Sequence, residues 1–213
     1  KRKFFNLKTT TKHMLFNLEN GLITLIYGPA ASGKTTIAFE ALLNYSKKGR
    51  VLFIDSENGF SVDRLKQIEP NCTKLLDNIV VLNMKNFSEQ IQIFDNLETM
   101  MKVGHFEIII IDTIGMQYRH AFQEKGYKYV NEKVLIGLTK LRNLAFKHDI
   151  PVLILNQIYT CPGGENVGVG GNLIKKFGKY LIELKNNPRR AILLKPFEKI
   201  IHFEINNSGL RKI

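Results

Sequence analysis

The sequence predicts an α/β fold: a mostly parallel sheet flanked by helices, with antiparallel strands at its C-terminal end. Two observations predict this class. Short apolar runs with little alternation recur up to residue 155, separated by stretches with helical periodicity. Such runs are typical of parallel strands that are buried on both faces. After residue 180 apolar and polar residues alternate instead, which is typical of antiparallel strands with one exposed face.

The elements of the first part alternate between strand and helix. A helix is expected after Lys34 and stops before Gly49, a second has Ser88 as its N-cap, and a third runs through Val134 and Ala145. Five buried strands are expected at 22–27, 51–55, 79–82, 108–111 and 151–155.

The alternating strands of the tail are expected at 180–185, 191–195 and 200–205, with turns at 186–188 and 207–209. We find no internal repeat and no linker rich in glycine, proline or serine between these parts. The sequence therefore predicts a single domain over residues 1–213.

Composition excludes several classes of protein. The chain has 31 Lys+Arg and 19 Asp+Glu, a formal net charge of +12, which attracts polyanions before any specific contact is made. No apolar stretch approaches the roughly 18 residues that cross a membrane, and no secretory signal precedes the first strand. Two cysteines far apart exclude a disulfide framework and a zinc site. We therefore expect a cytoplasmic protein with no membrane partner.

The strongest motif is a phosphate-binding loop. The segment 28–35, GPAASGKT, matches G-x-x-x-x-G-K-[ST] between a strand and a helix. Its backbone N–H groups would surround the phosphates of ATP, Lys34 would reach the β- and γ-phosphates, and Thr35 with Asp112 would hold Mg²⁺. The predicted nucleotide-binding residues of this segment are Gly28, Pro29, Ala30, Ala31, Ser32, Gly33, Lys34, Thr35 and Thr36.

Two further side chains are expected to face the γ-phosphate. Glu57 follows the strand 51–55, where its carboxylate can orient a water molecule. Gln157 ends the fifth strand, where its amide can bind the γ-phosphate or that water. The segment 158–172 comes directly afterwards and is rich in glycine, so it can move with what Gln157 senses: Gly163, Gly164, Gly168, Gly170 and Gly171.

Cations gather at two places along the chain, and at the first of them they lie among aromatic rings. Arg119, Lys125 and Lys128 lie in the segment 115–131, which also holds three tyrosines and a phenylalanine, and Lys175 and Lys176 follow the glycine-rich segment. Cations can bind phosphates while rings stack on bases, so we expect single-stranded DNA to bind here. A solvated, lysine-rich surface is the alternative at each position.

Together these motifs resemble the RecA/RadA recombinase superfamily, and within it the short archaeal paralogues of RadA. The resemblance covers essentially the whole chain. Besides the P-loop, it is carried by Ile54-Asp55-Ser56-Glu57-Asn58-Gly59-Phe60 with Arg64-Leu65 following, Ile111-Asp112, Asp149-Ile150-Pro151-Val152 running to Asn156-Gln157-Ile158-Tyr159, and Val169-Gly170-Gly171-Asn172.

The resemblance implies a RecA-like P-loop ATPase core without the N-terminal helical DNA-binding domain of full recombinases. It places Glu57, Lys34 and Gln157 in catalysis, with Glu57 activating water and Gln157 coupling the nucleotide to the DNA loop. It places Arg64 over the adenine, so Arg64 joins the predicted nucleotide-binding residues. The segments 115–131 and 158–172 fall on the two loops that line the DNA channel.

The function implied is that of an ATP-dependent DNA-binding protein of DNA repair and homologous recombination. Members of this group resemble one another in having a weak ATPase, in binding single-stranded DNA and in assisting a RadA-type recombinase or other repair proteins. The oligomeric state stays open.

Two other functions fit the P-loop. A KaiC-like regulatory ATPase would form hexamers without affinity for DNA. A small P-loop nucleoside or nucleotide kinase would need an arginine-rich lid, which the glycine-rich segment lacks.

Overall fold

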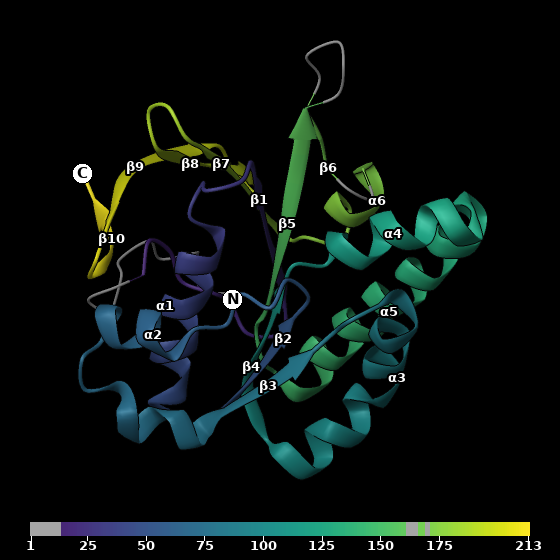
Figure 1. Ribbon diagram of the computed structural model, residues 1–213, viewed down its shortest axis with the longest axis horizontal. Coiled ribbons are helices and arrows are strands. Elements are labelled where there is room, and N and C mark those ends of the chain that lie inside the picture. Colours follow the sequence, from purple (N-terminus) through teal and green to yellow (C-terminus); the bar gives the residue numbers. More distant parts are fainter. Residues whose placement is uncertain (1–13, 161–165, 169–170) are drawn as a thin grey trace.

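The computed structural model describes residues 14–160, 166–168 and 171–213. Its ten strands form one mixed sheet, and nine of them follow the order β10-β9-β8-β7-β1-β5-β4-β2-β3, while β6 pairs with β5 (Figure 1). The expected α/β class, mostly parallel with antiparallel strands at the C-terminal end, is confirmed. The single domain over 1–213 stays a prediction.

The centre of the sheet is parallel. It consists of β1 (Ile23–Gly28), β5 (Val152–Thr160), β4 (Phe106–Asp112), β2 (Arg50–Asp55) and β3 (Ile79–Asn83). The pairing register places Gly28 opposite Gln157 and Asp55 opposite Asp112. The residues that follow or end these strands therefore meet at one edge of the sheet, where the carboxyl ends of parallel strands commonly form ligand sites.

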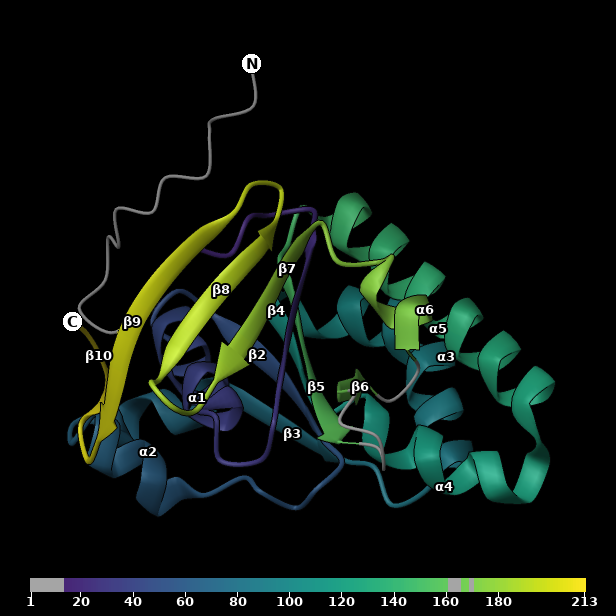
Figure 2. The ribbon, with the colours of Figure 1, turned by 90° about the horizontal axis from the view of Figure 1, so that it is seen from above.

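The C-terminal strands extend the sheet beyond β1. The first, β7 (Tyr180–Lys185), pairs with β1 in parallel, and β8 (Arg190–Lys195), β9 (Lys199–Asn206) and β10 (Gly209–Lys212) follow in antiparallel order (Figure 2). The sequence did not predict β10, because it is only four residues long and only Gly209 and Leu210 are buried.

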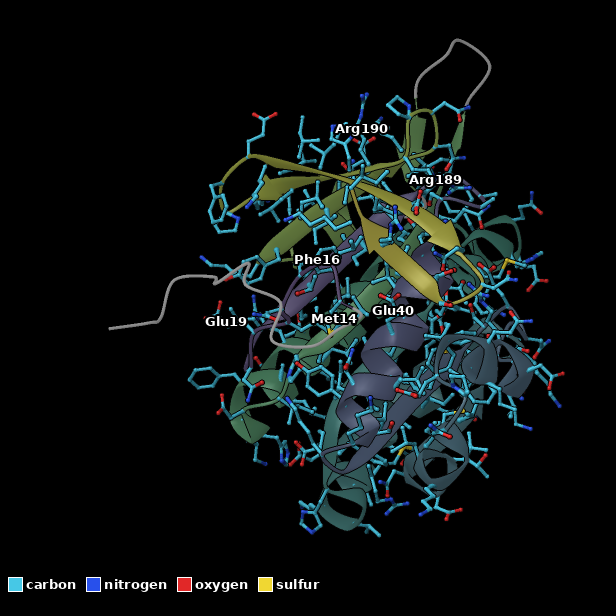
Figure 3. The ribbon with its side chains drawn as sticks, turned by 90° about the vertical axis from the view of Figure 1, so that its left-hand side faces the viewer. Met14, Phe16, Glu19, Glu40, Arg189 and Arg190 are labelled. Atoms are coloured by element: carbon cyan, nitrogen blue, oxygen red, sulfur yellow. The ribbon has the colours of Figure 1, made fainter. Side chains whose placement is uncertain are left out.

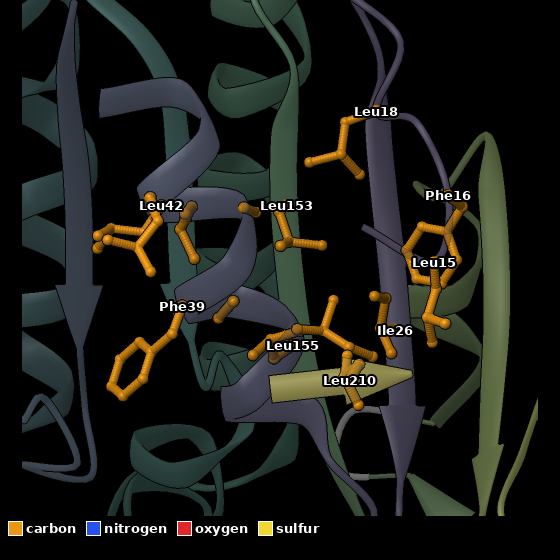
Figure 4. Close-up of a cluster of buried hydrophobic side chains, with 14 of the residues drawn as sticks. Leu15, Phe16, Leu18, Ile26, Phe39, Leu42, Leu153, Leu155 and Leu210 are labelled. Atoms are coloured by element: carbon orange, nitrogen blue, oxygen red, sulfur yellow. The ribbon is translucent and has the colours of Figure 1, made fainter. Parts of the chain in front are cut away.

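Helices cover both faces of the sheet. On one face lie α1 (Lys34–Ser46) and α2 (Val62–Ile68), followed by a 3₁₀ helix (Cys72–Asn78); on the other lie α3 (Phe87–Gly104), α4 (Gly115–Lys125), α5 (Tyr127–His148) and α6 (Gly171–Lys175). Each face has its own buried apolar cluster. On the α1 face, Leu210 of β10 lies among Ile26, Leu155 and α1, so this short strand closes the core (Figure 4).

Three expectations about local structure were wrong. The N-cap of α3 is Asn86, whose side chain accepts a hydrogen bond from the N–H of Glu89 at 2.9 Å, so the helix begins before Ser88. The segment 115–131 is not a loop, since it forms α4 and the start of α5. The fifth strand continues beyond Leu155 and pairs with β6 (Asn166–Gly168).

Among the residues that the structure describes, none of the helices combines the length and the apolar character that a bilayer crossing needs.

Candidate nucleotide-binding site

A cavity of about 390 Å³ lies at the carboxyl ends of β1, β2, β4 and β5. P-loop residues 30–36 form its floor, and six side chains from other elements complete its lining: Glu57, Asp112, Thr113, Gln157, Arg189 and Ile205. The structure therefore brings together the P-loop, the acid of the second strand, the acid of the fourth strand and the amide of the fifth. The sequence predicted each of these from a different motif.

The P-loop conformation depends on its glycines. Gly33 has φ +102° and precedes α1 directly, a left-handed conformation that side chains other than glycine rarely adopt. A Cβ on Gly28 would lie 2.8 Å from Ser32 Oγ and 2.9 Å from both Cβ and O of Leu184. Glycine at both positions lets the loop between β1 and α1 pack tightly against β7, so that the N-terminus of α1 opens into the cavity.

Lys34 is buried beside this loop. Its ammonium donates hydrogen bonds to the carbonyl oxygens of Gly28 at 3.0 Å and Pro29 at 2.7 Å. Burial lowers the pKa of Lys34, while Asp112 and Glu57 act in the opposite sense because their carboxylates favour the charged form. The ammonium is therefore held close to the position where P-loop lysines contact phosphate oxygens.

A network of hydrogen bonds holds Glu57 at the rim. The buried carboxylate of Asp55 accepts from the backbone N–H groups of Glu57 at 3.0 Å, Gly59 at 3.3 Å and Phe60 at 2.9 Å. The exposed Glu57 carboxylate accepts from the Thr113 hydroxyl at 2.9 Å. Asp55 therefore shapes the loop that carries Glu57, and Thr113 orients its carboxylate across the cavity.

The same network joins the ends of β2 and β4. The Ser56 hydroxyl donates to the carbonyl of Thr113 at 2.7 Å and accepts from the Thr113 N–H at 2.9 Å. The Ser56 N–H donates to the carbonyl of Asp112 at 2.9 Å. These buried bonds fix the distance between the loop carrying Glu57 and the strand carrying Asp112.

Asp112 lies at the bottom of the cavity and is buried. Burial, together with the nearby carboxylates of Glu57 and Asp55, raises its pKa to about 7, although the Thr35 hydroxyl and Lys34 oppose the shift. A hydroxyl and a carboxylate among neighbouring acids are donors that suit Mg²⁺, which usually keeps several waters and takes the remaining oxygens from phosphates. The described residues contain no cluster of three acidic, His or Cys groups that could hold a metal ion.

The sequence missed four residues of this site. Asp55 and Thr113 position Glu57, Arg189 enters from the turn between β7 and β8, and Ile205 comes from β9. Ile205 Cδ1 would lie 2.8 Å from a Cβ on Gly33, so it packs directly on the P-loop. The strand-end pattern could have indicated Asp55 and Thr113, but no local signal shows that the C-terminal strands reach the P-loop.

Comparison with known proteins agrees with this geometry. The family model described as Rad51 matches residues 4–195. The chain belongs to the Rad51 family. It is 32% identical over 208 residues to the DNA repair and recombination protein RadB of Methanocaldococcus jannaschii, covering 94% of this chain and 97% of that protein. The RadB of Methanoculleus marisnigri is 35% identical over 207 residues, covering 92% and 91%.

A solved structure supports the same assignment. The crystal structure of the RadB recombinase superposes with a TM-score of 0.76 and 26% identity, covering 93% of each chain. The expected resemblance to the short archaeal RadA paralogues, of which RadB is one, is confirmed, and so is the RecA-like core.

Three predicted nucleotide-binding residues of this Rad51-family chain, Gly28, Pro29 and Arg64, are not among the residues that line the cavity. Gly28 and Pro29 begin the P-loop and accept hydrogen bonds from Lys34, whereas Arg64 has other partners. The guanidinium of Arg64 donates to the carbonyls of Asn206 at 2.9 Å and Asn207 at 3.0 Å, and to Gln67 at 2.8 Å. Arg64 therefore holds the β9–β10 turn, next to the cavity residue Ile205. Its contact with adenine stays a prediction.

The predicted DNA-binding residues lie on the α3–α6 side. Lys125 and Lys128 are exposed where α4 meets α5, and the Lys125 ammonium donates to Ser88 Oγ at 3.3 Å. Lys175 lies over the ring of Tyr27, 4.3 Å from its centroid, and Lys176 is exposed. The side chain of Arg119, and residues 161–165 and 169–170 of the glycine-rich segment, lie outside the described residues.

Proposed function

We propose that this chain binds Mg·ATP in the cavity, hydrolyses it slowly, and in the ATP-bound state grips single-stranded DNA as an accessory of a RadA-type recombinase. One observation carries this proposal: a single cavity is lined by the P-loop, Glu57, Asp112 and Gln157. These are the groups that bind a triphosphate, position a water molecule and respond to the γ-phosphate.

The relatives support the biological setting. Proteins of the RecA/Rad51 family are ATPases, and the named relatives are DNA repair and recombination proteins. These names confirm the role in DNA repair and recombination expected from the sequence, and they do not favour a KaiC-like regulator or a nucleotide kinase. That this chain is a weak ATPase and acts beside a RadA-type recombinase belongs to the proposal.

Different residues of the chain carry out different parts of ATP hydrolysis in this proposal. The N–H groups of the P-loop and the Lys34 ammonium bind the β- and γ-phosphates and stabilise the charge that develops on them. The Glu57 carboxylate, oriented by Thr113, accepts a hydrogen bond from the attacking water and directs it at phosphorus. Thr35 and Asp112 would hold Mg²⁺, which neutralises phosphate charge when bound.

Gln157 offers a route from the nucleotide to DNA. It lies within β5 opposite Gly28, and three residues further along, Thr160 pairs with Asn166 of β6. A shift of the Gln157 amide toward a γ-phosphate therefore moves the same strand that leads into the glycine-rich segment and α6, where Lys175 and Lys176 lie. DNA affinity should then depend on the nucleotide.

The test is single-stranded DNA binding with ATP, ADP or no nucleotide, each at two salt concentrations, for the wild type and Lys34→Ala. We expect the wild type to bind DNA most tightly with ATP, with log affinity falling linearly with log salt. Lys34→Ala should lose the ATP effect, whereas the exposed control Lys195→Ala should keep it. DNA binding that is absent, or identical in all nucleotide states, would remove the proposed coupling.

A further inference from the structure

The turn between β7 and β8 is bound to the outside of the P-loop. Asn186 Nδ2 donates to the carbonyl of Ala30 at 3.2 Å, and Arg189 Nη1 donates to the carbonyl of Ala31 at 2.8 Å. Figure 3 shows Arg189 reaching from this turn, with Arg190 placed apart from it. The C-terminal strands therefore contact the nucleotide cavity from the side opposite Glu57 and Asp112.

With these two bonds, four consecutive carbonyl groups of the P-loop, those of residues 28–31, each accept a side-chain hydrogen bond. Lys34 donates to the carbonyls of Gly28 and Pro29, and the β7–β8 turn donates to the next two. Because the N–H groups of a P-loop converge on phosphate, its carbonyls point away and need donors elsewhere. Ala31 also has φ +58°, a left-handed conformation that is uncommon for alanine. The Arg189 bond therefore supports the residue of the loop that most needs support.

Within the described part of the chain, the charge of Arg189 has no counter-ion. The side chain is half-buried and lines the cavity, yet no ion pair with an Asp or Glu, and no hydrogen bond other than that to Ala31, is found for it among the described residues. A guanidinium carries five N–H donors. A cation with unused donors in the lining of a cavity that the P-loop also lines favours an anionic ligand.

We propose that Arg189 is a phosphate-binding residue that acts in cis: it holds Ala31 with one N–H and binds the polyphosphate of the nucleotide with others. Lys34 and Arg189 then supply two cations from opposite sides of the loop. Nucleotide binding is thereby linked to the β7–β8 turn, a part of the chain that none of the P-loop motifs includes. This inference rests on the proposed binding of ATP.

The chain offers a matched control in the next residue. Arg190 carries the same charge but does not line the cavity. It lies in β8, opposite His202 in the register of the β8–β9 strand pair. A general effect of net charge or of a disturbed hairpin should therefore appear in Arg190→Ala as well. An effect of phosphate contact should appear only at Arg189.

The experiment measures dissociation constants of Mg·ATP, Mg·ADP and adenosine for the wild type, Arg189→Ala, Arg189→Gln and Arg190→Ala. Arg189→Gln keeps an amide donor for the Ala31 carbonyl and removes the charge, so it separates support of the loop from phosphate binding. We expect both Arg189 variants to bind ATP at least about tenfold more weakly, while adenosine binding stays within about twofold. Arg190→Ala should bind ATP as the wild type does.

The outcomes separate this inference from the proposed function. If the wild type binds ATP and Arg189→Gln binds it equally well, the guanidinium only supports the loop and the inference is overturned. Equal losses in Arg189→Gln and Arg190→Ala would overturn it too, because net charge would then explain both. A wild type that binds no ATP would overturn the proposed function along with it. Melting temperatures without nucleotide show whether each variant is folded.

Discussion

The nucleotide edge of the sheet and the cationic surface where α4 meets α5 are built in opposite ways. At the edge, Asp55, Ser56 and Thr113 are buried; Ser56 and Thr113 bond to each other, Asp55 accepts from three backbone N–H groups, and these bonds measure 2.7 to 3.3 Å. At the α4–α5 surface, Lys125 and Lys128 are exposed. Of these two side chains, only that of Lys125 has a hydrogen-bond partner among the described residues, Ser88 Oγ at 3.3 Å.

This difference suits two kinds of recognition. Water attack on a phosphate requires groups placed within a fraction of an ångström, so the edge holds its side chains before a ligand arrives. A polynucleotide backbone is bound mainly through charge, which tolerates mobile side chains and depends on salt. Substitutions at the edge should therefore have large, localised effects, and substitutions on the α4–α5 surface small, additive ones.

The largest effect is expected at Glu57. Glu57→Gln keeps the shape of the side chain and an acceptor for Thr113 but loses the carboxylate that directs the water. Turnover should fall by about 10² to 10³, while ATP affinity should change by less than about threefold because the group contacts the water rather than the nucleotide. Phosphate release and equilibrium nucleotide binding measure the two quantities. With Glu198→Gln, an exposed control, both should be unchanged; a fall in affinity equal to that in turnover would contradict this role.

Asp55 tests whether the buried network is needed for the edge to form. Asp55→Asn replaces one acceptor oxygen of a carboxylate that receives three backbone N–H groups by an NH₂ donor. We expect the free energy of unfolding to fall by about 2 kcal/mol, with a loss of turnover because Glu57 is no longer held. Urea unfolding gives the first value. Asp77→Asn, at an exposed position, should change neither, and equal stability of the two variants would mean that the network is dispensable.

Glu40 extends the comparison to a buried carboxyl outside the site (Figure 3). Glu40 Oε1 accepts from the Leu210 N–H of β10 at 2.6 Å, and Oε2 has no hydrogen-bond partner among the described residues. Burial raises its pKa to about 8, although the Leu210 bond and Arg64 oppose the shift. The fold thus favours the neutral acid, and its contribution is complete below the unfolded pKa of about 4.5 and is lost as the pH rises to about 8.

The variant Glu40→Gln should remove this pH dependence, since the amide resembles the neutral acid. Between pH 6 and 9 the melting temperature of the wild type should fall relative to that of Glu40→Gln, by several degrees for a difference of about 1 to 2 kcal/mol. Parallel melting curves over this range would show that the Glu40 carboxyl is not protonated in the fold.

The sequence predicted the edge better than it predicted what surrounds it. The P-loop, Asp112 and Gln157 each belong to a local pattern of strand and turn, and parallel pairing alone is enough to bring such strand ends together. Arg189 lies in the β7–β8 turn and Ile205 in β9. No local pattern in the sequence shows that β7 pairs with β1 and so brings both residues to the P-loop. Serine and asparagine are both good N-cap residues, so the sequence did not decide between Ser88 and Asn86. In the structure α3 begins at Phe87, which makes Asn86 the N-cap. The segment 115–131 was expected to be a loop because the resemblance placed a loop of the DNA channel there, whereas in this chain it forms α4 and the start of α5.

The smallest effects are expected on the α4–α5 surface. Lys125→Ala and Lys128→Ala should each weaken single-stranded DNA binding only a few-fold and reduce the slope of log affinity against log salt by about 0.7, the amount for one phosphate contact. Lys102→Ala is the matched control, because it removes the same charge from an exposed position. Lys102 lies near the other end of α3, about 20 Å along the helix from Ser88. If all three variants change the slope equally, the effect comes from the net charge of the chain and not from a contact between this surface and DNA. If Lys125→Ala and Lys128→Ala instead cost as much as Glu57→Gln costs turnover, the surface is as preorganised as the edge, and the contrast between the two regions disappears.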